Sequence, residues 1–192
     1  VGGPLNPRTG KPFGSNTQAY LEWAAEQASQ GRDCLTDEQY EVAVSTSEAV
    51  RKHLVAKTLL IKGTPEGVVR AEYCGIPCQA RIDWFHPLRG IVDLKTADDL
   101  TWFEADAKRY GYAFQLAFYR SMVQVVTGNL YPVHLIGVEK KQPFRCGVWQ
   151  ISDQPLACCQ RENEAAIERL KECGAASYWP TGYEEARVFD AI

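Results

Sequence analysis

Residues 78–98, CQARIDWFHPLRGIVDLKTAD, place the strongest constraint on the fold. Apolar strand formers alternate with polar residues on both sides of a short connection that contains Pro87 and Gly90. Strand formers at a spacing of two, interrupted by proline and glycine, are typical of a β-hairpin. The stretch therefore predicts two antiparallel strands, over residues 78–85 and 90–95.

Alternation along these strands predicts which polar side chains share a face. On the first strand these are Arg81, Asp83 and Phe85, and on the second they are Asp93 and Lys95. Antiparallel pairing would bring Asp83, Asp93 and Lys95 together, and such a group is costly to desolvate unless a cation or substrate completes it. Carboxylate oxygens suit Mg²⁺, with Mn²⁺ as the alternative. The pattern predicts a metal-dependent phosphodiester site, with a surface ion pair as the alternative interpretation.

The charge distribution agrees with a polyanionic partner. The chain has a net charge of −3, but residues 51–95 hold eight Lys or Arg against four Asp or Glu. The remainder of the chain is acidic, so positive charge surrounds the acidic pair. Such a distribution favours the approach of a nucleic acid to a bound metal.

The chain of 192 residues suits one domain. We predict an extended arm over residues 1–15, a catalytic core over 50–140 and a C-terminal surface tail over 175–192. There is no apolar run long enough for a membrane span and no visible signal peptide. The seven cysteines include no C-x-x-C pair, so we expect free thiols in a cytoplasmic protein and no zinc ribbon.

Helical patterns flank the strands on both sides. A capping-box pattern, Thr36-x-x-Gln39, predicts the start of a helix that carries His53. The predicted helices span residues 16–30, 36–61 (either continuous or with a break), 98–110, 112–126 and 153–173, and the further strands span 67–74, 130–139 and 145–151. Glu72, on the strand over 67–74, either faces Asp83 or is a solvent-facing carboxylate.

The helix over residues 112–126 carries a stripe of side chains with polar tips. Tyr112, Gln115 and Tyr119 are spaced at i, i+3 and i+7 and share one face. Aromatic stripes are usually core. A glutamine and a tyrosine aimed at a catalytic strand would instead bind phosphate or orient the lysine.

In this order, KHLVAK, Glu72, RIDW, IVDLKT and YGYAFQLAFY resemble the exonuclease VIII (RecE)-like phage nucleases of the PD-(D/E)XK superfamily. The Gln-x-x-x-Tyr pattern is also similar to the RecB-family nuclease domain. The resemblance implies an α/β (α+β), restriction-endonuclease-like core. In that core a central mixed sheet, with an antiparallel three-strand meander, is flanked by helices.

The resemblance also implies roles for individual residues. His53, Asp83, Asp93 and the main-chain carbonyl of Leu94 would hold Mg²⁺ or Mn²⁺, and Lys95 would position or deprotonate the attacking water. The implied DNA contacts are Gln115, Tyr119, Tyr112 and, from its place beside Asp83, Arg81. Glu72 matches an acid near the family's site.

The implied activity is metal-dependent, 5′-to-3′ digestion of linear double-stranded DNA in phage-type recombination or repair. The implied partners are DNA ends, a single-strand annealing protein and further copies of the chain in a ring, with no membrane. Two alternatives stay open. One is an iron–sulfur nuclease with the same Gln-x-x-x-Tyr pattern, and the other is a non-catalytic DNA-binding domain on a nuclease fold.

Overall fold

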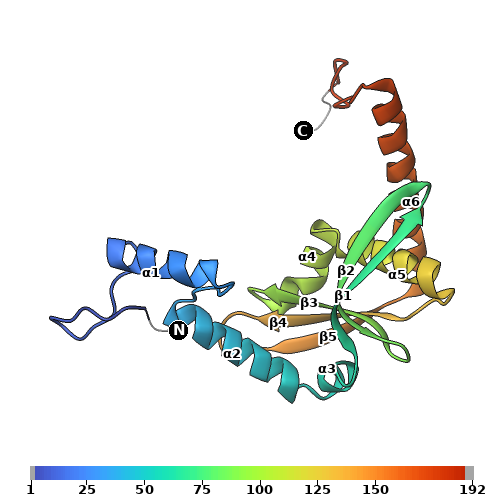
Figure 1. The fold of residues 1–192 in the computed structure, drawn as a ribbon. Helices are drawn as coiled ribbons and strands as arrows, with labels where there is room; N and C mark the ends of the chain where they lie inside the picture. The colour runs from blue at the N-terminus through green and yellow to red at the C-terminus, as the bar shows by residue number, and fades with distance from the viewer. Residues whose placement is uncertain (1–2, 189–192) are drawn as a thin grey trace.

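The computed structural model describes residues 3–188 (Figure 1). Its helices are α1 (Gln18–Ser29), α2 (Asp37–Lys52), α3 (Leu54–Leu59), the 3-10 turn η1 (Leu100–Trp102), α4 (Phe103–Arg109), α5 (Tyr112–Thr127) and α6 (Asp153–Ala176). Its strands are β1 (Thr64–Tyr73), β2 (Ile76–His86), β3 (Gly90–Ala97), β4 (Val133–Glu139) and β5 (Cys146–Ile151). The helix predicted over residues 36–61 is broken at His53, which separates α2 from α3.

The strands form one five-stranded sheet in the order β1-β2-β3-β4-β5. β1, β2 and β3 are an antiparallel meander, and β4 pairs parallel to β3. A parallel connection needs a crossover, which α4 and α5 supply. β5 returns antiparallel to β4 as the predicted hairpin. The protein therefore has the predicted α+β fold, a mixed sheet with a three-strand meander flanked by helices.

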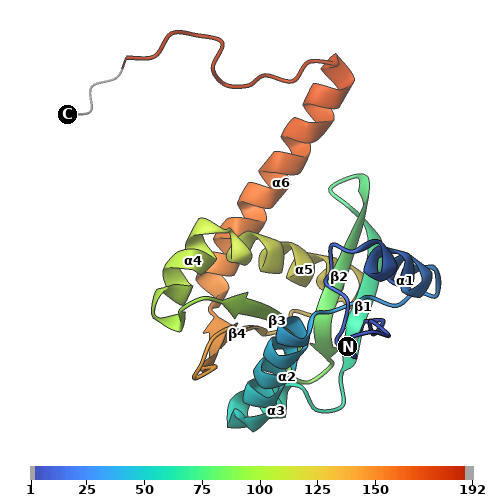
Figure 2. The ribbon, with the colours of Figure 1, turned by 90° about the vertical axis from the view of Figure 1, so that its left-hand side faces the viewer.

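Helices cover both faces of the sheet (Figures 1 and 2). α2 and α3 pack on one face, where Val50, Ala56 and Leu59 contact Val92 and Ile136. α5 and the beginning of α6 pack on the opposite face, in a cluster that contains Ile82, Ile91, Leu116 and Leu156. Both faces of the central strands are thus buried.

The two ends of the chain lie outside this layered core. α1 has no buried residue, and α6 projects away from the sheet beyond its first turns (Figure 2). Residues 174–188 are exposed, which covers the described part of the predicted tail over 175–192. Within residues 3–188, no helix combines the length and the apolarity that crossing a membrane would need.

Local sequence signals set the helix boundaries near the sheet. Thr36 Oγ1 accepts from the Gln39 amide at 3.2 Å and Gln39 Oε1 accepts from the Thr36 amide at 2.9 Å, so the predicted capping box is present. Gly111, with φ of 67°, separates α4 from α5, and Gly128, with φ of 74°, ends α5. Both conformations are left-handed and favour glycine.

The predicted strict alternation along residues 78–85 is wrong at one point. Ile82 and Phe85 pack into the same cluster, although they are three residues apart, whereas Trp84 packs into the cluster on the other face. The irregularity lies at Asp83, where the β1–β2 ladder lacks a pair between Pro65↔Trp84 and Gly67↔Ile82. The position that faces this gap on β1 is Glu66, whose φ is 52°.

Gly90, at the start of β3, is predicted to be intolerant of any side chain. Its φ is +85°, and an added Cβ would lie 2.0 Å from the Pro132 carbonyl oxygen. Since that oxygen belongs to the backbone, we expect Gly90→Ala to lower the free energy of unfolding by about 3 kcal/mol or more. Urea denaturation measures the change.

Gly128→Ala is the matched control for this substitution. Gly128 has a similar φ of +74°, but an added Cβ would meet nothing within 4 Å. Only the left-handed strain remains, so a loss of about 1 kcal/mol is expected. Equal losses for the two variants would show that the contact with Pro132 does not matter.

Candidate active site

The site begins on β3, where Asp93 and Lys95 both face α5. Asp93 is 1% exposed, and Lys95 Nζ lies 2.7 Å from its Oδ2. The same ammonium donates to Gln115 Oε1 at 3.0 Å. Lys95 is therefore held between a buried carboxylate and the side chain of α5.

The predicted stripe on α5 surrounds this lysine. Gln115 Nε2 donates to the Tyr119 hydroxyl at 2.8 Å, and Lys95 Nζ lies 5.0 Å from the centroid of the Tyr112 ring. The second contact is a cation–π interaction. The structure thus confirms that Tyr112, Gln115 and Tyr119 share one helix face, and it aims that face at Lys95.

Asp83 occupies the point where β2 and β3 separate. The two strands pair only from Trp84↔Val92 to His86↔Gly90. One residue before Trp84, Asp83 Oδ2 accepts a hydrogen bond from the Leu94 amide at 3.0 Å. The carboxylate thus takes the place of a strand carbonyl. The two acids lie side by side at the opening between the strands.

The Leu94 carbonyl points into the same opening. In an extended strand the N–H and C=O of one residue point to the same side, and the Leu94 N–H points to Asp83. Asp83, Asp93 and the Leu94 carbonyl therefore form a set of oxygen donors at one sheet edge. Such a set is typical of a site for a hard cation.

The environment of Asp93 is that of an incomplete site. Burial raises the pKa of the Asp93 carboxyl, the Lys95 ammonium lowers it, and the Asp83 charge raises it further. Within residues 3–188, the polar contact recorded for the buried Oδ2 is the Lys95 ammonium, whose Nζ lies 2.7 Å away. One ammonium leaves further lone pairs of this buried carboxylate unsatisfied, which is costly. The residues present therefore fit a divalent cation that would bind this oxygen.

His53 is not brought to the acids. Its Nδ1 accepts from the Ala56 amide at 3.2 Å, so the side chain caps α3 on the other face of the sheet. It lines a separate cavity of about 400 Å³ with Glu48 and Cys146. In the part of the chain that the structure describes, no three His, Cys, Asp or Glu side chains gather as a metal cluster. The predicted set of His53, Asp83 and Asp93 is therefore not assembled.

Glu72 also lies away from the opening. It pairs with Pro77, near the tip of the β1–β2 hairpin, which places it about 20 Å along the strand from Asp83. The structure gives no contact between this predicted acid and the site. Arg81 lies closer, exposed on β2, with its Nε 3.1 Å from Glu66 Oε2. Its predicted contact with DNA stays a prediction.

Glu66 was not predicted from the sequence to lie near the site. This residue lies opposite Asp83 on β1 and has a positive φ, which is uncommon for any residue other than glycine. Backbone strain of this kind gathers at functional sites. Because the predicted strand began at residue 67, Glu66 was placed outside it. The predicted strand over residues 78–85 reaches Trp84 and Phe85. If the strand that pairs with it had been predicted to extend equally far, it would have included Glu66.

The cysteines give no support to an iron–sulfur cluster. All seven are free thiols. Cys158 and Cys159 are neighbours on α6, Cys146 is on β5, and no three thiols gather within residues 3–188. The iron–sulfur alternative therefore has no set of ligands in this fold.

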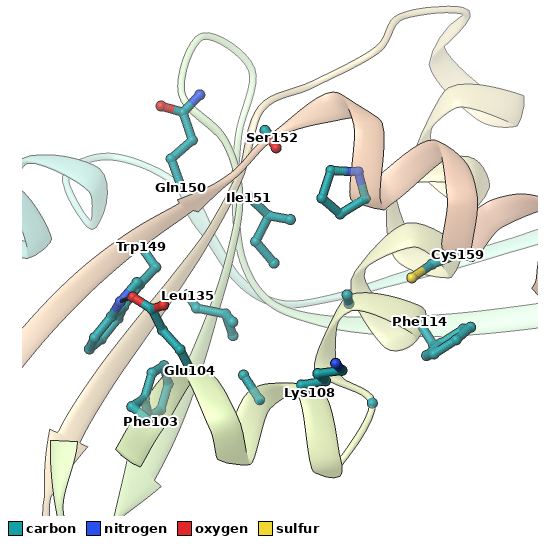
Figure 3. A pocket seen from close by; sticks show the side chains of 14 residues that line it. Phe103, Glu104, Lys108, Phe114, Leu135, Trp149, Gln150, Ile151, Ser152 and Cys159 are labelled. Atoms are coloured by element: carbon teal, nitrogen blue, oxygen red, sulfur yellow. Dashed lines mark hydrogen bonds between the residues drawn. The ribbon is translucent and has the colours of Figure 1, made fainter. Parts of the chain in front are cut away.

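A cavity of about 590 Å³ lies on the α5 side of the sheet (Figure 3), where its lining residue Leu135 is the neighbour of Asp93 on the next strand. Phe103, Leu135, Trp149 and Ile151 give it an apolar lining. The indole Nε1 of Trp149 donates to Glu104 Oε1 at 3.0 Å at its edge. Neither candidate metal-binding acid lines it, so this cavity is separate from the strand opening at Asp83 and Asp93.

Comparison with known proteins places these features in a family. Residues 13–191 match the family model described as "PDDEXK-like domain of unknown function (DUF3799)". A search of curated proteins finds no significant match. The family match covers almost the whole chain, including α1 and the tail as well as the predicted core over 50–140.

Solved structures share the fold at low sequence identity. A protein provisionally assigned as an exonuclease from Eubacterium rectale superposes with a TM-score of 0.67 and 16% identity, over 91% of this chain and 71% of that one. A phage-related exonuclease from Haemophilus somnus 129PT has a TM-score of 0.40 and 13% identity, over 88% and 91% of the two chains. An alkaline exonuclease from Laribacter hongkongensis has a TM-score of 0.32 and 17% identity, over 84% and 88%. The first of these establishes a common fold.

Proposed function

Because the chain belongs to the PDDEXK-like family DUF3799, we propose that it is a Mg²⁺-dependent deoxyribonuclease. The observation that carries this proposal is the group of Asp83, Asp93 and Lys95 where β2 and β3 separate, with Asp93 buried and paired with the Lys95 ammonium. The common fold and the provisional exonuclease assignment of the Eubacterium rectale protein support the choice of a nuclease.

In this proposal Asp83, Asp93 and the Leu94 carbonyl hold the cation. A bound Mg²⁺ lowers the pKa of a coordinated water and neutralises charge on the phosphate. Asp83 has a second task, because its hydrogen bond to the Leu94 amide fixes the spacing between the separating strands. Mn²⁺ would fit the same oxygen donors.

Lys95 holds the attacking water beside the phosphate. Its ammonium is fixed by Asp93 on one side and by Gln115 on the other, and Tyr119 fixes the amide of Gln115. This chain of contacts limits the movement of Nζ. A fixed ammonium orients the water at its oxygen and stabilises negative charge that develops on the phosphate.

The finer assignment is an exonuclease that acts on the ends of linear double-stranded DNA, with 5′-to-3′ polarity and a role in phage-type recombination or repair. Gln115, Tyr119, Tyr112 and Arg81 would contact the DNA backbone, which requires no base sequence. A ring of several copies and a single-strand annealing protein are the proposed partners. These assignments extend the resemblance of the sequence motifs.

The direct test of this function is the release of acid-soluble nucleotides from linear duplex DNA by the purified chain. Release in Mg²⁺ and its loss in EDTA are expected. DNA binding without release in either Mg²⁺ or Mn²⁺ would instead favour the non-catalytic DNA-binding domain.

His53 is not among the proposed metal ligands, so its substitution should affect stability and not metal binding. Since His53 Nδ1 caps α3, His53→Ala should lower the free energy of unfolding by about 1 kcal/mol. Its affinity for Mn²⁺, measured by titration calorimetry, should stay within about twofold of the wild type. Asp83→Asn is the comparison variant, and it should weaken Mn²⁺ binding strongly. If His53→Ala weakens binding as much as Asp83→Asn does, His53 is a ligand after all.

A further inference from the structure

A row of rings and cations leads from Lys95 to the surface. Lys95 Nζ is 5.0 Å from the Tyr112 ring centroid, and the Tyr112 and Tyr110 rings stack with their centroids 6.0 Å apart and 26° between their planes. The Arg109 guanidinium lies over the Tyr110 ring, 5.6 Å from its centroid. We call Lys95, Tyr112, Tyr110 and Arg109 the aromatic row. It connects the candidate catalytic strand with the corner between α4 and α5.

The backbone at Gly111 creates this row. On a continuous helix, two residues separated by two positions are rotated by about 200° about the axis and point to nearly opposite sides. Tyr110 and Tyr112 would therefore not meet on such a helix. Tyr110 instead follows the last residue of α4, and Gly111, with φ of 67°, turns the chain into α5. The turn brings the two rings to the same side. The stack is thus a product of a left-handed glycine and not of helix periodicity.

Packing accounts for Tyr112 but not for Tyr110. Tyr112 is half-buried and contacts Phe103, with 6.4 Å between ring centroids. Tyr110 is 61% exposed, and its only aromatic or cationic ring contacts in residues 3–188 are Tyr112 and Arg109. Single exposed aromatic residues are common. An exposed ring that continues a row from a candidate catalytic lysine is a specific arrangement.

We propose that Tyr110 is the stacking platform for a base of the DNA strand being cut, next to the phosphate that a cation at Asp83 and Asp93 would bind. This inference rests on the proposed function and names a substrate contact that it lacked. Base–aromatic stacking accepts every base, because each has a π face. Such a contact suits an enzyme that reads no sequence, and it selects a strand whose bases are unpaired.

Arg109 completes this proposed contact. Lys108 and Arg109 are both exposed at the end of α4, beside Tyr110. A base that stacks on Tyr110 displaces the guanidinium from the ring, and Arg109 then pairs with the adjacent phosphate. A guanidinium next to an exposed ring combines the two elements that sites for single-stranded nucleic acids use.

Binding of a fluorescent single-stranded oligonucleotide in EDTA tests the proposal, with fluorescence anisotropy as the readout. We expect Tyr110→Ala to weaken binding about fivefold or more, and Tyr110→Phe to bind within about twofold of the wild type, since the ring is kept. Tyr178→Ala is the matched control, because Tyr178 is 59% exposed but lies beyond α6. It should bind as the wild type does.

An oligonucleotide with an abasic terminal nucleotide separates stacking from a loss of structure. If the base stacks on Tyr110, the stacking contact is already lost when the base is absent. The Tyr110→Ala variant and the wild type should therefore bind the abasic strand with equal affinity. A loss that persists with the abasic strand, or Tyr110→Ala binding like Tyr178→Ala, would overturn the proposal. Wild-type protein that binds no single strand would also overturn it.

These outcomes are separate from those of the proposed function. Binding is measured without a metal, so it does not depend on cleavage. A protein that stacks DNA on Tyr110 but never cuts it would contradict the nuclease assignment alone.

Discussion

Asp93→Asn is expected to abolish DNA cleavage while the metal-free protein keeps its thermal stability. The carboxylate is 1% exposed, its pKa is raised chiefly by burial, and its Oδ2 lies 2.7 Å from the Lys95 ammonium. Asparagine has nearly the same shape and no charge to desolvate. The folded state therefore loses little, whereas the proposed metal site loses its most buried oxygen ligand.

We expect a decrease of about a thousandfold or more in kcat/KM, the range found when one strong electrostatic contact to a transition state is removed. The melting temperature without metal should change little, because removing the desolvated charge raises stability whereas losing the ion pair with the partly exposed Lys95 lowers it. Nuclease assays and thermal melts on the same preparation measure both quantities.

Asp98→Asn is the matched control for this variant. It makes the same chemical change at an exposed carboxylate near the end of β3, where Asp98 forms an ion pair with Lys140 at 3.0 Å. Its activity and stability should stay close to those of the wild type. Near-normal cleavage by Asp93→Asn would show that the carboxylate does not take part in the reaction.

Addition of Mg²⁺ is expected to stabilise the wild-type protein, which is the second large effect. A cation that binds the folded state and not the unfolded state adds about 2.7 kcal/mol when its concentration is a hundred times its Kd. The double variant Asp83→Asn, Asp93→Asn should show no such increase, since both acids of the opening are then neutral. Thermal melts across a Mg²⁺ titration give the comparison.

Chelation supplies the reverse experiment. EDTA should return the wild type to its metal-free melting temperature and leave the double variant unchanged. An equal rise with Mg²⁺ in both proteins would mean that the cation binds elsewhere and that the two acids are only a structural pair.

The order of elements was predictable because each has a strong local signal. Thr36 and Gln39 form the capping box, and Pro87 and Gly90 mark the β2–β3 connection. The shared face of Tyr112, Gln115 and Tyr119 on α5 was also predictable, since helix periodicity alone decides which side chains share a face. The contact between Gln115 and Lys95 follows from that face once α5 crosses the sheet.

The remainder of the site depends on contacts that periodicity does not contain. Alternation failed at Asp83 because the ladder is interrupted opposite Glu66, whose positive φ has no sequence signal in a residue other than glycine. His53 was predicted as a ligand from the family resemblance, whereas a lone histidine on a helix is more often structural. Its Nδ1 caps the first turn of α3, a tertiary detail that motif order does not reveal.

The register of the hairpin decided the outcome for Glu72. The sequence predicts two strands joined by a turn at residues 75–77, but it does not decide whether the Glu72 side chain faces Asp83 or solvent. The observed pairs place Glu72 opposite Pro77 and leave Glu66 opposite Asp83. A register is fixed by the turn and by which faces are buried, so it became clear only with the whole sheet.

Cleavage of end-labelled DNA distinguishes a metal-dependent exonuclease from a DNA-binding domain. Linear duplex DNA labelled at the 5′ or the 3′ end, and a closed circular duplex, would be incubated with the wild type or Asp93→Asn in Mg²⁺ or in EDTA. The account predicts loss of the 5′ label from linear DNA by the wild type in Mg²⁺ only, with the circle intact. Cleavage that persists in EDTA or in Asp93→Asn, or no cleavage by the wild type in any metal, would contradict it.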